Sequence, residues 1–579
     1  MFQPVADPVA GSLAWSALVA ALPLITLFVL LGVMRWKAWQ AGLASLVVAL
    51  GVAVLAFGMP AGQALLSASE GAAFGLFPII WIVLAAIWIF RLTELTGYDL
   101  VLRRAFGSVS PDQRIQAILI AFCFGALLEA LAGFGTPVAV TAVMLMAVGI
   151  PRIKAASVAL VANTAPVAFG AVAVPITTLG KITGLDPDTL GAMVGRQTPV
   201  LAAFVPLLLV GMVDGRRGLR TTWLPALVGG FAFAIGQFLS SNFFSYQVAD
   251  IIAAAAGALG VVVLLRVWQP AEVLVGTPVG DDDLVPVAVG APATASGTTG
   301  RPVPAAAGGP SRRPGSSTGS DESGDAGSVP VALREGLMAF APYLVVVAFF
   351  TAVSFGPLQT FLVTHSGWKL AWPGLHVAGS SGKPLAAATF NVNVFSAAGT
   401  VLLLAGIVTA VVYGVSAAGA ASALRKVVVQ FRFTILTVTA VLALAYVMNF
   451  SGQTVTLGLA LAATGSLFAV LSPVVGWIGV AVTGSDTSSN SLFGLLQVTA
   501  AEKTGLDPYL LAAANTSGGV LGKMISPQNL AIAAAVVGME GKESELLRKV
   551  LGWSLGLLAG MCVLVYLQST PVLGWMVVR

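Results

Sequence analysis

Long apolar runs free of charged residues make up most of the chain. Six of them contain no Asp, Glu, Lys or Arg, namely residues 8–34, 38–69, 71–90, 221–249, 384–424 and 550–578. A helix needs about 20 apolar residues to cross the roughly 30 Å core of a membrane, so these runs predict single crossings separated by turns. The pattern predicts an all-α polytopic membrane protein with about 12–14 membrane segments.

The composition agrees with this class. Charged residues make up 9% of the chain and apolar residues 57%, whereas a soluble domain carries about 25% charged residues. With 579 residues and one short polar interruption, there is no room for a large soluble domain. The two cysteines, Cys123 and Cys562, lie inside apolar segments, so neither a disulfide framework nor a metal site is indicated. We expect no cofactor.

The basic residues gather in short loops between apolar segments, so the net charge of +5 does not indicate nucleic-acid binding. The positive-inside tendency places such loops in the cytoplasm and therefore the N-terminus outside. Residues 1–34 carry only Asp7 as a charge and lack a basic leader, so we expect the first helix to be retained as a span. The loop residues are Arg35, Lys37, Arg103, Arg104, Arg114, Arg152, Lys154, Arg216, Arg217, Arg220, Arg425 and Lys426.

The stretch between Arg114 and Arg152 predicts a re-entrant hairpin. Both ends are basic, and the 37 residues between them hold one charge, Glu129. A continuous helix of this length would measure about 55 Å, too long for one crossing and too short for two. We therefore expect a hairpin over 115–151 that turns at Glu129–Pro137, where Gly and Pro break the helix and protein or a watery cavity covers the backbone.

A short pattern, A-N-T-x5-G-x4-P, occurs twice, beginning at Ala162 and at Ala514. The surrounding parts recur in the same order, which predicts two repeats, about 74–213 and about 428–570, with the second hairpin at about 473–500. The loop charges place the start of the first copy outside and the start of the second inside. The repeats are therefore expected to be inverted, an arrangement in which the site lies at the midplane between them. Pro166 and Gly518-Gly519 predict an unwound backbone near both Asn residues.

The repeats lie in two membrane halves, 1–269 and 332–579. Residues 270–331 are rich in Gly, Pro, Ala, Ser and Thr without apolar periodicity, which predicts a disordered cytoplasmic linker. A second polar interlude, 364–394, contains both histidines, His365 and His376.

Two acids survive inside apolar runs, and each has two interpretations. Glu129 is expected to carry the coupling proton, since an intramembrane acid marks a functional site by default; the alternative is a structural carboxyl bonded to hairpin backbone. Asp486 is the only charge between Arg432 and Glu502. It is either a helix N-cap or the second proton-coupling candidate, as a cation partner or as a group paired with Lys523.

Uncharged polar residues in the two copies are candidates for binding a carboxylate or a hydroxyl, although polar side chains also hold membrane helices together. Lys523, eight residues or about 12 Å beyond Asn515, either neutralises an anionic substrate or extends to the interface. The first copy has Ala171 there. The predicted substrate-binding residues are Asn163, Thr164, Gly133, Gly135, Thr136, Ser485, Thr487, Ser488, Asn515, Thr516 and Lys523.

Six motifs resemble those of the bacterial L-lactate permease family, and the likeness extends over the chain except for the linker and the 364–394 interlude. Two features depart from the family pattern. Leu131 stands beside the acid, where small residues are usual, and the linker is long. The motifs are FCFGALLE (122–129), AGFGTPVA (132–139), NTAPVAFG (163–170), VGRQ (194–197), TGSDTSSN (483–490) and GKMISPQ (522–528).

The resemblance implies an inner-membrane transporter, not an enzyme, that imports L-lactate, with D-lactate or glycolate as further substrates, by proton symport. The Asn-Thr elements are also similar to those of elevator-type carboxylate transporters, which implies a mobile unit made of both hairpins and both Asn-Thr helices. A homodimer stays open as an oligomeric state. The alternatives are a sodium-coupled carboxylate transporter and a passive organic-anion channel; an embedded enzyme is disfavoured because both histidines lie outside the motifs.

Overall fold

The first half of the chain is a succession of helices. The computed structural model describes residues 1–579 except 133–134, 276–332, 355, 379–388, 396 and 579. The first-half elements are α1 (Leu13–Ala20), α2 (Leu22–Phe28), η1 (Val29–Val33), α3 (Ala38–Leu55), α4 (Ala61–Phe74), η2 (Gly75–Ile80), α5 (Trp81–Thr96), α6 (Tyr98–Gly107), α7 (Gln113–Gln116), η3 (Ala117–Phe124), α8 (Gly125–Ala132), α9 (Thr136–Ala147), α10 (Arg152–Ala162), η4 (Val167–Phe169), α11 (Gly170–Thr183), α12 (Pro187–Val194), α13 (Thr198–Ala202), α14 (Val205–Thr221), α15 (Trp223–Phe243), η5 (Tyr246–Val248) and α16 (Ala249–Leu265).

The second half adds further helices and two short strands. Its elements are α17 (Leu333–Ser354), α18 (Gly356–Ser366), β1 (Gly367–Ala371), β2 (Thr389–Asn393), α19 (Ala398–Val412), α20 (Ala417–Gln430), α21 (Arg432–Ser451), α22 (Gln453–Ala462), η8 (Gly465–Leu467), α23 (Phe468–Thr483), α24 (Asp486–Thr504), α25 (Pro508–Gly522), η9 (Lys523–Ile525), α26 (Pro527–Val536), α27 (Glu543–Gln568) and η10 (Gly574–Met576).

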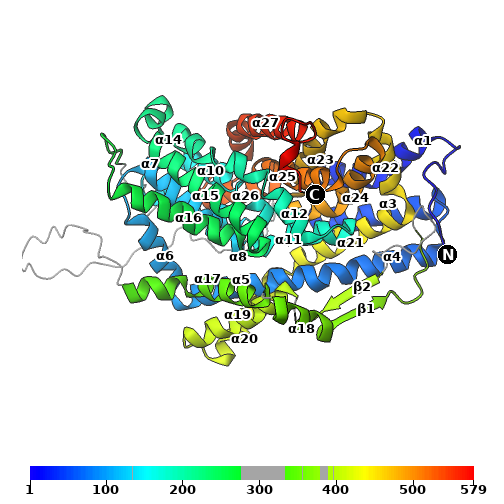
Figure 1. Ribbon diagram of the computed structural model, residues 1–579, viewed down its shortest axis with the longest axis horizontal. Helices are drawn as coiled ribbons and strands as arrows, with labels where there is room; N and C mark the ends of the chain where they lie inside the picture. Colours follow the sequence, from blue (N-terminus) through cyan, green and yellow to red (C-terminus); the bar gives the residue numbers. More distant parts are fainter. Residues whose placement is uncertain (133–134, 276–332, 355, 379–388, 396, 579) are drawn as a thin grey trace, which may run out of the picture.

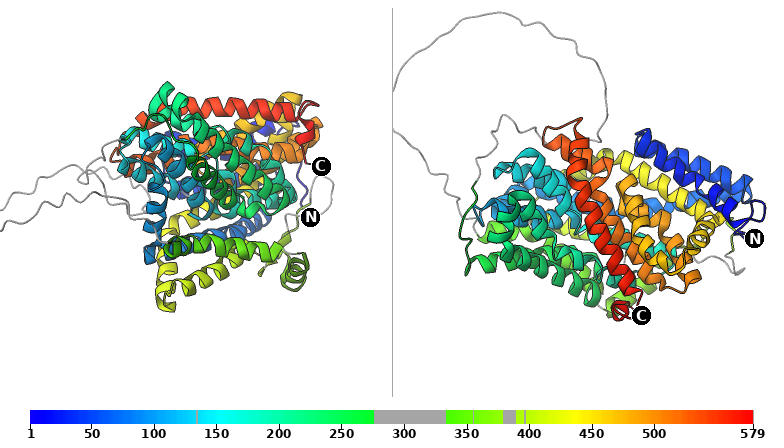
Figure 2. Two further views of the ribbon diagram at one scale, coloured as in Figure 1. Left: turned by 60° about the vertical axis from the view of Figure 1, so that its left-hand side comes forward. Right: turned by 90° about the horizontal axis from the view of Figure 1, so that it is seen from above.

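The two halves pack closely together. Figure 1 shows α5, α17 and α19 side by side along one edge, below the helices α8 to α16. Seen from above in Figure 2, α27 crosses the molecule diagonally, with cyan and green helices on one side and the blue N-terminal, yellow and orange helices on the other. It packs against α10 of the first half and against α23 and α25 of the second. One continuous apolar core contains residues from both halves.

The helices are long and apolar enough for a multi-pass membrane protein, as predicted. Within the described residues, 11 helices could cross a membrane, or up to 12 when the bent pair α10–α11 counts as one span. With that pair the number reaches the lower end of the predicted 12–14. Three shorter apolar helices, α9, α19 and α22, are not among them.

The helices follow the order predicted for the two copies. α5 and α21 each end at a left-handed glycine, Gly97 (φ 75°) and Gly452 (φ 89°), a conformation that glycine adopts without strain. Each is followed by a short helix of 10 residues, α6 or α22. A pair of hairpin helices and then the helix with the Asn-Thr element come next in both halves. The inverted relation between the copies stays a prediction.

Each predicted hairpin corresponds to two helices that pack against each other. In the first, α8 ends at Ala132 and α9 begins at Thr136. In the second, α23 ends at Thr483 and α24 begins at Asp486, with a left-handed glycine, Gly484 (φ 74°), between them. These helices extend beyond the predicted 473–500 at both ends. Re-entry into the membrane stays a prediction for both.

The Asn163 helix is broken, as Pro166 predicts. α10 ends at Ala162, and the chain bends by 60° before it continues as α11. Three successive residues after the break, Ala171, Val172 and Ala173, have left-handed φ values of 45°, 56° and 55°. Left-handed backbone costs roughly 1–2 kcal/mol for each such residue, so the surrounding packing must hold this turn in place.

The predicted unwinding at Asn515 is wrong. α25 continues without interruption through Asn515 to Gly522, and the chain leaves the helix only at Ser526. Gly518 serves close packing instead, because a Cβ atom there would lie 2.1 Å from the carbonyl oxygen of Pro473 in α23. The glycines therefore let α25 and α23 approach each other closely, and α25 keeps its backbone hydrogen bonds.

We expect Gly518→Ala to destabilise the protein by about 1–3 kcal/mol, the usual cost of overpacking. The added methyl group meets backbone that cannot rotate away. The matched control is Gly552→Ala in α27, where a Cβ atom would find nothing within 4 Å. Thermal unfolding in detergent should show a lower melting temperature for Gly518→Ala alone. Equal melting temperatures for the two variants would contradict the packing argument.

The N-terminus and the polar interlude lie together. The Phe2 amide donates to the His376 carbonyl (2.8 Å), and the His376 amide donates to Gln63 Oε1 in α4 (2.7 Å). β1 and β2 form an antiparallel pair here, a small departure from the all-α prediction. Figure 1 places the N-terminus at the opposite end from α6, α7 and α14, whose loops carry basic residues. The end with the N-terminus is the predicted outside.

Residues 276–331 of the predicted 270–331 linker lie outside the described residues. Its first residues are held against the first hairpin, contrary to the prediction of disorder from 270 onward. The Leu274 amide donates to Asp112 Oδ2 (3.2 Å), and the Leu274 carbonyl accepts from the Gln113 amide (2.9 Å). The chain is therefore attached to the start of the first hairpin at least as far as Leu274.

Candidate substrate and proton site

A buried ion pair joins the two halves of the chain. Lys523, at the end of the Asn515 helix, donates from Nζ to Oε1 of Glu129 in α8 at 2.6 Å. Lys523 is 6% exposed and Glu129 is 3% exposed. A lysine that reached the interface would be exposed at its tip, so that interpretation fails. Sequence reasoning had offered Asp486 as a partner for Lys523; the structure pairs the lysine with Glu129 instead.

Glu129 also contacts the broken helix of its own half. Asn163 donates from Nδ2 to Oε2 of Glu129 at 2.9 Å, so both carboxylate oxygens have a partner. Space for the carboxylate comes from Gly170, where a Cβ atom would lie 2.8 Å from Oε1 of Glu129. The break after Ala162 thus brings an amide and a glycine to the same carboxylate. The structure unites Glu129, Asn163 and Lys523, three of the predicted residues.

Both hairpin tips lie on α26. A Cβ atom at Gly135 would lie 2.4 Å from Cδ1 of Ile532, and one at Gly484 would lie 2.7 Å from Oε1 of Gln528. Gln528 and Ile532 are one helical turn apart, about 6 Å. The two tips therefore contact neighbouring turns of the helix that follows Lys523. Gly133, also a predicted tip residue, lies outside the described residues.

Asp486 is the first residue of α24 and is buried next to the Asn515 helix. A Cβ atom at Gly519 would lie 2.4 Å from Oδ1 of Asp486. Neither oxygen of this carboxyl has a hydrogen-bond partner among the described residues, although it interacts electrostatically with Lys523. An ionised carboxylate without partners is costly to bury, so this position favours a group that can hold a proton.

The hydroxyl groups of the second tip begin α24. Ser485 is the N-cap and accepts from the Ser488 amide at 3.3 Å. The N-cap alternative for Asp486 is therefore wrong, since Asp486 is the first residue inside the helix. Thr487 and Ser488 are buried in the first turn, whereas Thr136 at the first tip is half-buried. A substrate role for the hydroxyl residues stays a prediction.

The second Asn-Thr element is held by Asn490 of the hairpin. Asn515 donates from Nδ2 to Oδ1 of Asn490 (2.9 Å), and the Thr516 hydroxyl donates to the same oxygen (3.0 Å). Gln497 donates to Oδ1 of Asn515 (3.0 Å). Asn490 in turn donates to the Pro175 carbonyl in the broken helix of the first half (3.1 Å). In this conformation the polar atoms of Asn515 are bonded to protein, so substrate contact would require an exchange of partners.

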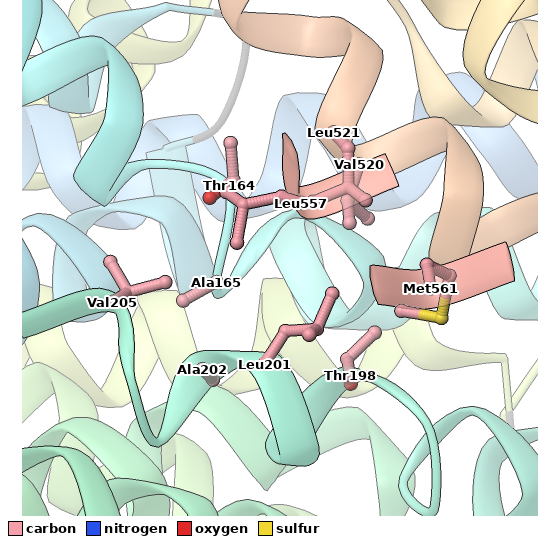
Figure 3. A pocket seen from close by; sticks show the side chains of 10 residues that line it. All are labelled: Thr164, Ala165, Thr198, Leu201, Ala202, Val205, Val520, Leu521, Leu557 and Met561. Carbon is pink, nitrogen blue, oxygen red and sulfur yellow. The ribbon is translucent and has the colours of Figure 1, made fainter. Parts of the chain in front are cut away.

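Thr164 lines a small cavity beside the broken helix (Figure 3). Its other walls come from Ala165 and from α13, α25 and α27, including Thr198, Val520 and Met561. It offers about 10 Å³ to the centre of a water-sized sphere, enough for about one water molecule. The cavity is too small for an organic solute, so in this conformation it could hold no more than water.

The sequence analysis missed three buried acids, Glu70, Asp112 and Asp250. Asp250, near the start of α16, is 0% exposed and accepts from Nε2 of Gln237 at 2.9 Å. It is the only charged residue between Arg220 and Arg266, so the criterion that selected Glu129 and Asp486 would have found it. It lies outside both copies of the repeated pattern, within which the candidate residues were sought.

A buried polar site within a bundle of membrane-crossing helices is typical of solute transporters, and intramembrane ionisable residues mark such sites. The family can be assigned directly. The chain belongs to the L-lactate permease family, whose model matches residues 16–572, and the resemblance of the motifs is thereby confirmed.

Relatives match the chain over nearly its full length. Glycolate permease GlcA of Escherichia coli is 38% identical, over 98% of this chain and 98% of that protein. L-lactate permease of Bacillus subtilis is also 38% identical, with the same coverage of both chains. Among solved structures, MtrF of Neisseria gonorrhoeae is 11% identical with a TM-score of 0.43, covering 86% of this chain and 82% of that one.

Proposed function

We propose that this protein imports L-lactate and related 2-hydroxy acids, including D-lactate and glycolate, across the bacterial inner membrane by proton symport. The full-length relatives include an L-lactate permease and a glycolate permease, which supports the substrate class. The observation that carries the coupling is the buried Lys523–Glu129 pair between the two halves.

Lys523 can exchange the carboxylate of Glu129 for that of the substrate. Lys523 is the cation for an incoming substrate carboxylate, but Glu129 occupies it in this conformation at 2.6 Å. Substrate must therefore displace Glu129 from Nζ. A buried carboxylate that loses its cation carries a large desolvation penalty, so Glu129 takes up a proton as substrate binds.

The charge count supports a ratio of one proton to one substrate. Before binding, Lys523 and Glu129 sum to zero. After binding, Lys523 and the substrate carboxylate sum to zero while Glu129 is neutral. The loaded and empty sites then carry the same charge, so neither conformation buries an uncompensated ion. Asp486 is the runner-up as proton carrier because both its oxygens lack partners in the described part of the chain.

The substrate would lie where the hairpin tips meet, near Lys523 and the start of α26. Asn163, which donates to Glu129, and the tip hydroxyl groups would replace its water contacts, and the start of α26 would offer backbone N–H donors. We propose that both hairpins, α10–α11 and α25–α26 move together as one unit against the other helices. Discontinuous helices at a midplane site fit this type of movement.

The test is uptake of labelled L-lactate into proteoliposomes with imposed ion gradients. We expect accumulation against the lactate gradient when the outside is acidic, together with alkalinisation of the medium. Accumulation that requires a sodium gradient instead would overturn proton coupling. Lactate flux that only equilibrates under every gradient would identify a passive channel.

A further inference from the structure

Asp250 is tied by hydrogen bonds to the broken helix of the site. Its Oδ1 atom accepts from Nε2 of Gln237 (2.9 Å), and the same nitrogen donates to the carbonyl of Ala165 (3.3 Å). The Thr198 hydroxyl donates to Oε1 of Gln237 (3.2 Å). Through one glutamine, Asp250 is thus connected to the residue that follows Thr164 and to a wall of the small cavity.

The position near a helix N-terminus explains only part of this burial. A helix dipole favours an acid in the first turn, but Oδ2 of Asp250 has no hydrogen-bond partner among the described residues, and the residue is 0% exposed. A carboxylate buried with one oxygen unpaired is strongly penalised, whereas the cost for a protonated carboxyl is much smaller.

The charged groups that face Asp250 belong to the site. α16 packs against η3, α8, α15 and η5. The titratable residues on these elements are Cys123, Glu129 and Tyr246, while α15 has none. Asp250 interacts electrostatically with Glu129 and, from η9, with Lys523. Lys523 therefore interacts with the carboxyls of both Glu129 and Asp250, and it already forms an ion pair with Glu129.

A small cavity lies near this acid. Thr198 lines the cavity of Figure 3, which has room for about one water molecule. Its hydroxyl is two hydrogen bonds from Asp250, by way of Gln237. Water that enters the cavity would bring an exchangeable proton close to a carboxyl whose second oxygen is unpaired.

We infer that Asp250 is a second proton-binding carboxyl, and that its charge sets the pH range over which Glu129 loads its coupling proton. This inference rests on the proposed proton symport. When Asp250 is ionised, its negative charge favours the protonated form of Glu129. Asp250 is thus a positioning residue for the proton, since it acts through Glu129.

The test is the pH profile of lactate uptake by Asp250→Asn in proteoliposomes. This variant keeps the shape of the side chain and removes its charge. We expect wild-type rates at acidic pH and a loss on the alkaline side, with half-maximal uptake shifted down by roughly 1 pH unit. Asp250→Glu, which restores a titratable carboxyl, should recover the wild-type profile. Lactate exchange without a gradient should persist in Asp250→Asn, which shows that the variant is folded and able to move.

The possible failures can be told apart. If the wild type shows no proton-driven uptake, the proposed function itself fails. If the wild type is proton-driven and Asp250→Asn has the same pH profile, Asp250 does not bind an exchangeable proton. If Asp250→Asn and Asp250→Glu both lose lactate exchange, the carboxyl is structural and the inference is overturned.

Discussion

Replacing Lys523 by glutamine is expected to abolish lactate uptake, with a fall of more than about a hundredfold. Removing one member of a buried ion pair costs about 3–5 kcal/mol, since Glu129 would be left without its cation. The substrate carboxylate would lose the same cation. Initial rates of labelled L-lactate uptake and lactate-induced thermal stabilisation measure the two effects. Neither should be detectable in Lys523→Gln.

Two controls separate charge from folding. Lys503→Gln, at an exposed lysine of α24, should leave uptake unchanged. The double variant Glu129→Gln/Lys523→Gln removes both charges, so it should unfold at a higher temperature than Lys523→Gln while still failing to transport. Lactate binding by the single variant would show that another group holds the carboxylate.

Several site residues could be predicted because each breaks a local rule. Glu129 is a lone acid in an apolar run, and Asn163 and Asn515 belong to a repeated pattern. Polar groups are costly at membrane depth, so their positions are informative without any knowledge of the fold. The same reasoning applies to the left-handed glycines that end α5 and α21, because Gly is the residue that tolerates this conformation.

The contacts between site side chains could not be predicted from the sequence because they join distant parts of the chain. Lys523 and Glu129 are separated by 394 residues, and spacing in the sequence says nothing about such a contact. Gly518 was misassigned for a related reason. A glycine that relaxes the backbone and one that admits a neighbouring helix look alike in sequence, and only the 2.1 Å approach to Pro473 distinguishes them.

The structure also changes the meaning of the duplication. Asn163 bonds to the proton-carrying candidate Glu129, whereas Asn515 bonds to Asn490 and Gln497. Lys523 has Ala171 as its counterpart, and that residue lies in the left-handed turn. One copy therefore contributes the acid and the other contributes the base to a single ion pair. Two equal half-sites would not create this dependence of one repeat on the other.

Replacing Glu129 by glutamine should separate substrate binding from proton coupling. The variant no longer competes with substrate for Lys523, so lactate should bind more tightly, by about ten- to a hundredfold if one charged hydrogen bond of about 1.5–3 kcal/mol is at stake. Binding should also lose its dependence on pH. Without a titratable group at this position, the variant should not accumulate lactate when a proton gradient is imposed, although it should still exchange bound lactate across the membrane.

The matched control for this prediction is Glu502→Gln, at an exposed residue of α24, which should accumulate lactate as the wild type does. Exchange shows whether Glu129→Gln is folded and able to move, so a failure to accumulate can be assigned to coupling. Proton-driven accumulation that persists in Glu129→Gln would remove Glu129 from this role. Asp486 would then be the next carboxyl to replace, because it is buried beside Gly519 and interacts with the same lysine.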